Sequence, residues 1–150
     1  MARHFSLQPL CDLAQERVET ATRELATLKQ QWQLQEDKLK QLQLFQSEYR
    51  RRLHDTLTLG VDMTRMRDFQ VFLHKIDIAL RQQQIEIEHA RVRWEHGQRA
   101  WMEARRKLKT YDVLKERHQQ KEAQRDGRIE QREQDEHARK RYSSKKHTEE

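Results

Sequence analysis

Few residues of this chain have the types and spacing that could do chemistry. His118 and Glu122 lie four residues apart, so a helix would place both on one face, where they could ligate a metal ion. Such pairs arise readily in a charge-rich helix, and with Cys11 as the single cysteine a thiolate metal site is excluded. Asp135 and Glu136 are adjacent, so a helix points them to different sides. These residues predict no metal site and no catalytic acid–base pair.

The elements of a nucleotide site are also missing from the sequence. No glycine-rich loop and no Gly-Lys-Ser or Gly-Lys-Thr sequence is present to cradle a phosphate. Three glycines and one proline offer little turn chemistry, and 37% of the residues are charged against 34% that are hydrophobic. This composition is typical of long helices that expose most of their surface. We predict that the chain is not an enzyme and binds no cofactor.

The apolar residues instead follow a seven-residue repeat. Every seventh residue from Met66 and from Phe69 occupies the a and d positions of a coiled coil, as far as Tyr111. The same two positions recur upstream, between Leu7 and Leu53. A sustained 3.5-residue period predicts two helices that pack in a left-handed supercoil. The predicted core of this coiled coil consists of Val18, Leu25, Leu28, Trp32, Leu39, Leu53, Phe69, Leu73, Leu80, Ile87, Trp94, Trp101 and Leu108.

A turn is expected between the two repeats. Gly60 tolerates the left-handed conformation that ends a helix, and Asp62 or Thr64 can cap the next helix. We therefore predict an all-α fold, a long two-helix antiparallel coiled coil that forms a helical hairpin. The predicted segments are an N-terminal arm over 1–6, helix 1 over 7–59, a turn over 60–64, helix 2 over 65–117, a charged single-helix overhang over 118–141 and a disordered tail over 142–150.

Two registers of this hairpin fit the repeat. The first places Leu25 opposite Gly97 and generally sets large side chains against small ones, as close packing requires. The second is one heptad longer and places Gln46 opposite Gln83. We favour the first register because it also shortens the connection between the helices.

Two apolar features lie outside the a and d positions. Near the turn, Phe45, Phe72 and Ala79 occupy the neighbouring g position and widen the apolar face beyond what two helices can cover. Such a face either adds packing between the helices or forms a binding site. A second apolar stripe occupies the f position, which points away from the partner helix, and comprises Val71, Ile78, Ile85 and Val92. This stripe is either scattered surface aliphatics or the contact for a third helical surface.

The charge pattern gives little guide to partners. Thirty-one Lys and Arg residues against 25 Asp and Glu give a net charge of +6, spread along the chain. The basic residues are densest from Arg91 to Lys109, where no exposed aromatic platform accompanies them, so we predict no nucleic-acid partner. No run of 18 apolar residues and no apolar N-terminal segment is present, which predicts a cytosolic chain without a signal peptide or transmembrane helix.

Short motifs over nearly the whole chain carry a family resemblance. They are Asp12-Leu13-Ala14, Glu48-Tyr49-Arg50, Phe69 with Phe72, Trp101, Leu108, Glu116-Arg117 and Asp135-Glu136-x-Ala138. In this order and spacing they resemble the FliJ family, the small coiled-coil component of the bacterial flagellar type III export ATPase complex. The resemblance implies a role in flagellum biogenesis, protein export and thereby cell motility and chemotaxis, with a fold similar to the central shaft of rotary ATPases.

The resemblance also implies partners and a location. Members of the family join the flagellar export ATPase hexamer to the cytoplasmic part of the export gate protein, and they bind export chaperones. This chain would then lie in the cytoplasm at the base of the flagellum, peripheral to the membrane and reaching it only through the gate. By position, the gate-binding patch of the family maps to Leu42, Phe45, Tyr49, Phe72, Ile76, Ala79 and Gln83, with phenylalanine, isoleucine and glutamine replacing tyrosine, leucine and histidine at 45, 76 and 83.

The contact with the ATPase ring is expected at the open end of the hairpin. The basic candidates there are Arg105, Arg106, Lys107, Lys109 and Arg117, which otherwise form an ordinary solvated surface. The alternative hypothesis is a generic coiled-coil scaffold that self-associates through the f-position stripe and has no role in export.

Overall fold

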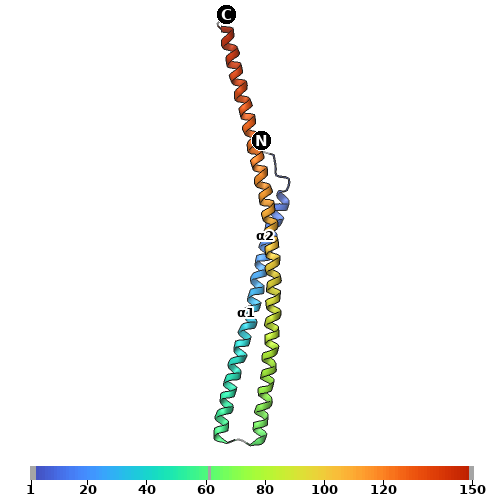
Figure 1. The fold of residues 1–150 in the computed structure, drawn as a ribbon, viewed down its shortest axis with the longest axis vertical. Helices are drawn as coiled ribbons and strands as arrows, with labels where there is room; N and C mark the ends of the chain where they lie inside the picture. The colour runs from blue at the N-terminus through green and yellow to red at the C-terminus, as the bar shows by residue number, and fades with distance from the viewer. Residues whose placement is uncertain (1–2, 61, 149–150) are drawn as a thin grey trace. The chain divides into compact units, whose positions relative to one another are not determined.

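The computed structural model describes residues 3–60 and 62–148, and these residues form two α-helices and no strand. Helix α1 spans Gln8–Leu59 and helix α2 spans Met63–Thr148. The chain divides into two compact units. The first, here called the hairpin unit, is Glu19–Glu103, and the second, the open-end unit, combines Met1–Val18 with Ala104–Glu150. Within each unit α1 and α2 lie side by side (Figure 1), which confirms the predicted all-α helical hairpin.

The turn uses the residues that the sequence singled out. Gly60 has a φ of 85°, the left-handed conformation that a residue with a Cβ adopts only with strain. Its N–H donates to the carbonyl of Leu57 at 3.3 Å, which closes the last turn of α1. Asp62 accepts a hydrogen bond from the backbone N–H of Arg65 at 2.8 Å, so it caps the N-terminus of α2. Helix α2 therefore begins at Met63, two residues earlier than predicted.

The packed faces of the helices follow the predicted heptads. Every residue of the a and d sets, from Leu7 to Leu53 and from Met66 to Tyr111, is buried or half-buried. Full burial is nevertheless rare, and the buried hydrophobic residues are Cys11 and Ala14 in the open-end unit with Ile76 and Ala90 in the hairpin unit. Two helices cover only one side of each other, so the remaining apolar side chains stay partly exposed.

Polar side chains in the hairpin unit establish which residues face each other. The amide of Gln83 donates to both the backbone carbonyl and the side-chain oxygen of Gln35, each at 2.8 Å. The amide of Gln46 donates instead to Asp77 at 2.8 Å. The longer register, which pairs Gln46 with Gln83, is therefore wrong.

The packing around Gly97 confirms the shorter register. A Cβ placed on Gly97 would lie 2.5 Å from Cδ1 of Leu28 and 3.6 Å from Cδ1 of Leu25. The predicted opposition of Leu25 and Gly97 is thus present, and Leu28 fills the space that the missing side chain leaves. One helical turn away, the rings of Trp32 and Trp94 pack with their centroids 5.3 Å apart.

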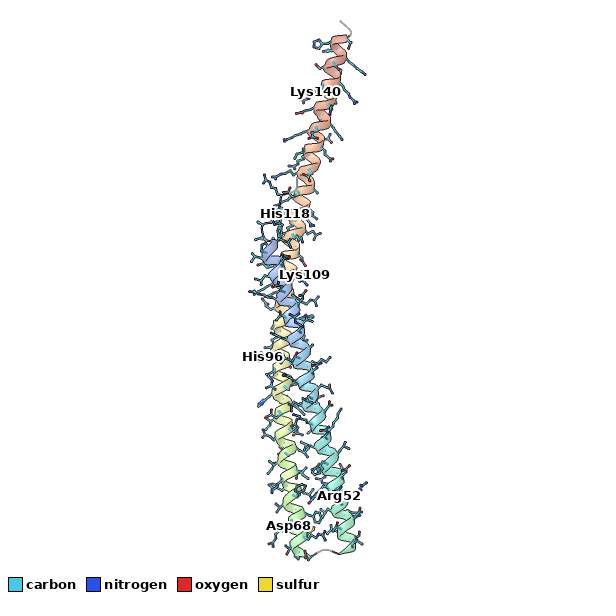
Figure 2. The ribbon with its side chains drawn as sticks, turned by 180° about the vertical axis from the view of Figure 1, so that it is seen from behind. Arg52, Asp68, His96, Lys109, His118 and Lys140 are labelled. Atoms are coloured by element: carbon cyan, nitrogen blue, oxygen red, sulfur yellow. The ribbon has the colours of Figure 1, made fainter. Side chains whose placement is uncertain are left out.

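The C-terminal part of α2 differs from the prediction. Half-buried positions continue to Glu122, and every residue from Ala123 to Thr148 is exposed, so the unpaired part of the helix begins later than residue 118. Figure 2 shows the side chains around Lys140 projecting on all sides of this helix, with no second helix beside it. Among the described residues, neither helix carries a stretch long and apolar enough to span a bilayer.

Residues 142–148 are helical, and the predicted disorder of this segment is wrong. The hydroxyl of Thr148 donates to the carbonyl of Ser144 at 2.7 Å, and Lys146 lies over the ring of Tyr142 at 5.8 Å. The last turn also carries basic residues, and positive charge stabilises a helix at its C-terminus, the negative end of the helix dipole. Residues 149 and 150, which complete the predicted tail, lie outside the described residues.

Candidate interaction surfaces

The hairpin unit carries a cluster of aromatic rings near its turn, which we call the tip patch. Tyr49 of α1 packs against Phe72 of α2 with ring centroids 4.5 Å apart, and Phe45 meets the same Phe72 edge-on at 6.1 Å. Phe69 extends the cluster, with its ring 5.6 Å from that of Tyr49. Phe45 and Phe72 remain 46% and 38% exposed. The tip patch therefore presents partly exposed rings whose positions are held by neighbouring rings.

The other predicted patch residues lie deeper. Ile76 is only 5% exposed, and Leu42 and Ala79 are half-buried. Gln83 is half-buried and directs its amide at Gln35, so its donor capacity is used within the hairpin. The structure brings Phe45, Tyr49 and Phe72 together as a surface. Ile76 and Gln83 lie beneath that surface, in the seam, which is the set of a and d positions where α1 and α2 face each other.

The f-position stripe is exposed along α2. Its four aliphatic residues, Val71, Ile78, Ile85 and Val92, are between 37% and 52% exposed. Their exposure agrees with their heptad position, which points away from the a and d positions that face α1.

The basic candidates for a ring contact lie in the open-end unit. Arg105, Arg106, Lys107, Lys109 and Arg117 are all exposed. In the hairpin unit, Arg91 is engaged by Glu88 and Glu95 on its own helix. The hydrogen bond from Arg91 lowers the pKa of Glu88, and the same bond raises the pKa of Arg91. Arg91 is thus compensated within its own helix.

The N-terminal arm contacts α2 at the residues that have metal-ligand spacing. The backbone N–H of Arg3 donates to Glu122 at 3.2 Å, and the carbonyl of Arg3 lies 2.9 Å from Nε2 of His118. The ring of Phe5 packs on the ring of His118, which is labelled in Figure 2, with centroids 5.4 Å apart. His118 and Glu122 therefore hold the arm, and the contacts of residues 3–5 cover α2 as far as Glu122.

A groove opens between the two helices of the open-end unit. It has a volume of about 520 Å³ and lies between Leu10 and Leu13 of α1 and Tyr111 and Leu114 of α2. Leu10 and Leu13 are 44% and 42% exposed, although both are large and apolar. Ala14, which is buried, also lines the groove. Because its side chain is small, it fills less of the space between the helices than the neighbouring leucines do.

The arm contact and the groove were missed by reasoning from the sequence. For the arm the sequence signal is slight: its hydrogen bonds use backbone groups of Arg3, and the ring of Phe5, which packs on His118, lies outside the heptad repeat. For the groove a signal is present: Leu10, Leu13 and Arg17 recur at the three- and four-residue spacing of one helix face, beside the a and d positions.

Comparison with known proteins assigns the chain to a family. The family described as Flagellar FliJ protein matches residues 3–147. The Flagellar FliJ protein of Escherichia coli (strain K12) is 29% identical over 138 residues, which cover 92% of this chain and 94% of that relative. The Flagellar FliJ protein of Salmonella typhi is 28% identical with the same coverage. The match spans the arm, the hairpin and most of the exposed helix, and the chain belongs to the FliJ family.

Proposed function

We propose that this chain is a stalk-like adaptor that links the flagellar export ATPase hexamer to the cytoplasmic part of the export gate protein and binds export chaperones. Membership of the FliJ family supports a component of the flagellar export apparatus, and a member of this family is not an enzyme. The observation that carries the proposal is the tip patch, where Phe45 and Phe72 stay exposed although apolar. Its place of action is the cytoplasmic face of the membrane at the flagellar base.

The two units offer different chemistry for two partners. Aromatic side chains held by neighbouring rings lose little conformational entropy on binding, which suits the tip patch to a lasting contact with the export gate protein. The open-end unit presents five exposed basic side chains, which suit an acidic surface such as the lining of a ring. In this proposal the tip patch binds the gate and the open-end unit enters the ATPase ring.

Steady-state ATP hydrolysis by the cognate export ATPase tests the ring contact. The full chain is expected to stimulate hydrolysis. Lys109→Glu combined with Arg117→Glu should raise the concentration for half-maximal stimulation about tenfold, because attraction becomes repulsion at two exposed sites. A chain of residues 1–122, which lacks the exposed part of α2 but keeps the residues that hold the arm, should lose stimulation. Lys40→Glu, an exposed charge change in the hairpin unit, is the matched control and should behave as wild type.

The absence of stimulation by the full chain, together with failure to co-purify with the ATPase, would exclude the ring contact. Stimulation that persists in the double variant and in the truncated chain would show that the ring uses another surface.

A self-associating scaffold is the second candidate function, and the exposed f-position stripe favours it. If the stripe pairs two copies, sedimentation velocity should show a dimer whose population rises with protein concentration. Ile78→Lys should weaken that dimer about tenfold or more, because it sets a charge in an apolar contact. A monomer at all concentrations excludes the scaffold, and the exposed Met102→Lys change on the same helix, at the b position, serves as control.

A further inference from the structure

The groove of the open-end unit has the dimensions of a site for a third helix. Its walls follow the helix axes: Leu10, Leu13 and Arg17 line it on α1, and on α2 the lining runs from Ala104 to Leu114. Ten residues of helix extend about 15 Å, so the groove accommodates roughly three turns of a partner helix. Both walls repeat at spacings of three and four residues, which is how a helix packs its side chains between those of its neighbours.

The surface of the groove is apolar at its centre and basic at its edges. Its apolar lining includes Leu10, Leu13 and Leu114, and one cation stands on each wall, Arg17 on α1 and Lys107 on α2. Both cations are exposed, and neither makes an ion pair with any other described residue. A ligand that matched this surface would be apolar along one stripe and acidic on both flanks.

We propose that this groove binds an amphipathic helix of a partner protein, with apolar residues at i, i+3 or i+4 and i+7 and with acidic residues flanking them. Burial of the apolar stripe against Leu10 and Leu13 provides the affinity. The cations Arg17 and Lys107 select the acidic flanks and reject basic ones. The described part of the N-terminal arm does not fill the groove, since residues 3–5 are engaged at His118 and Glu122.

Two designed peptides test the proposal on the full chain. Each has about 15 residues with leucines at i, i+3, i+7 and i+10, and one carries glutamates on its flanks where the other carries lysines. Fluorescence anisotropy at physiological salt should show that the glutamate peptide binds at least about tenfold more tightly than the lysine peptide. Arg17→Glu combined with Lys107→Glu should reverse this preference, while circular dichroism remains that of the wild type.

Leu13→Gln should weaken the glutamate peptide about tenfold. Because Leu13 is 42% exposed, its replacement leaves no buried cavity. Leu44→Gln, at a position that is 65% exposed on the same helix and outside the groove, is the matched control and should bind as wild type.

Equal binding of the two peptides, no binding of either, or binding that survives Leu13→Gln would overturn the proposal. So would a wild-type dimer in sedimentation that Leu13→Gln dissociates, because the groove would then belong to a second copy of the chain. The test needs only the chain and the peptides, so it stands or falls independently of a role in export.

Discussion

Replacing Phe72 by alanine is expected to weaken binding of the cytoplasmic part of the export gate protein about thirtyfold, equivalent to about 2 kcal/mol at a central aromatic contact. Phe72 is the ring that Phe45 and Tyr49 both contact, so its removal takes away exposed apolar area and also releases its neighbours. Isothermal titration calorimetry with the wild type and the variant measures the loss.

Leu44→Ala is the matched control for this measurement. Leu44 is 65% exposed on α1, next to Phe45 in the sequence but on the side away from the seam. It should leave the affinity unchanged, and circular dichroism should show both variants to be as helical as the wild type. If Phe72→Ala binds with the wild-type affinity, the tip patch is not the gate contact.

Ile76 is a poor choice for the same experiment, although it belongs to the predicted patch. At 5% exposure its truncation would remove buried packing, with a loss of stability of about 2–5 kcal/mol. A weaker complex with Ile76→Ala would therefore report the stability of the hairpin as much as the contact with the gate.

Replacing Gly97 by leucine is expected to lower the free energy of unfolding by about 1–3 kcal/mol, the usual cost of overpacking. Even a Cβ at this position would lie 2.5 Å from Leu28, so a full leucine side chain forces the two helices apart. Gly97→Ala should be nearly neutral, since the flexible end of Leu28 can rotate away while alanine gains about 1 kcal/mol of helix propensity. Urea unfolding followed by circular dichroism measures both changes.

Gly127 provides the control, because it lies in the same helix and its added Cβ would have no described neighbour within 4 Å beyond the adjoining residues and backbone of its own helix. Gly127→Leu should lose no stability and should raise the helix content of the exposed part of α2. An equal response at both glycines would show that helix propensity, rather than the contact between Gly97 and Leu28, controls the outcome.

The sequence was sufficient to predict the hairpin because one physical signal, the heptad repeat, recurs along both helices. Each seam residue from Leu7 to Tyr111 indicates the same buried face of its helix. The polar residues Gln35 and Gln46 therefore do not change which face is predicted to be buried. The register followed from the sizes of facing side chains and from the shorter connection, and Gly97 leaves space that the facing Leu28 fills. The exposed rings of the tip patch were predictable for the same reason, as apolar residues that two helices cannot cover.

The features that escaped prediction lack such repetition. The arm forms its hydrogen bonds to His118 and Glu122 through the backbone of Arg3, which any residue carries, and its ring contact, Phe5 on His118, follows no repeat. The groove residues Leu10, Leu13 and Arg17 share one helix face, but over only about two turns, and their spacing does not show that the surface is hollowed beside the small Ala14. The helical end of α2 depends on hydroxyl and ring contacts over a single turn, too short a range to give a pattern.

The hydrogen bonds that join α1 and the N-terminal arm to α2 connect residues that are progressively farther apart along the chain. The separation is 31 residues for Gln46 and Asp77, and it reaches 119 for Arg3 and Glu122. Closing the shorter loop costs less entropy, by about 0.6 kcal/mol for each halving of its length. The hairpin should therefore close like a zipper that starts beside Gly60, and it should open in the reverse order. A helix bound in the groove would hold together the last layers to close, so it would slow the unzipping of the whole chain.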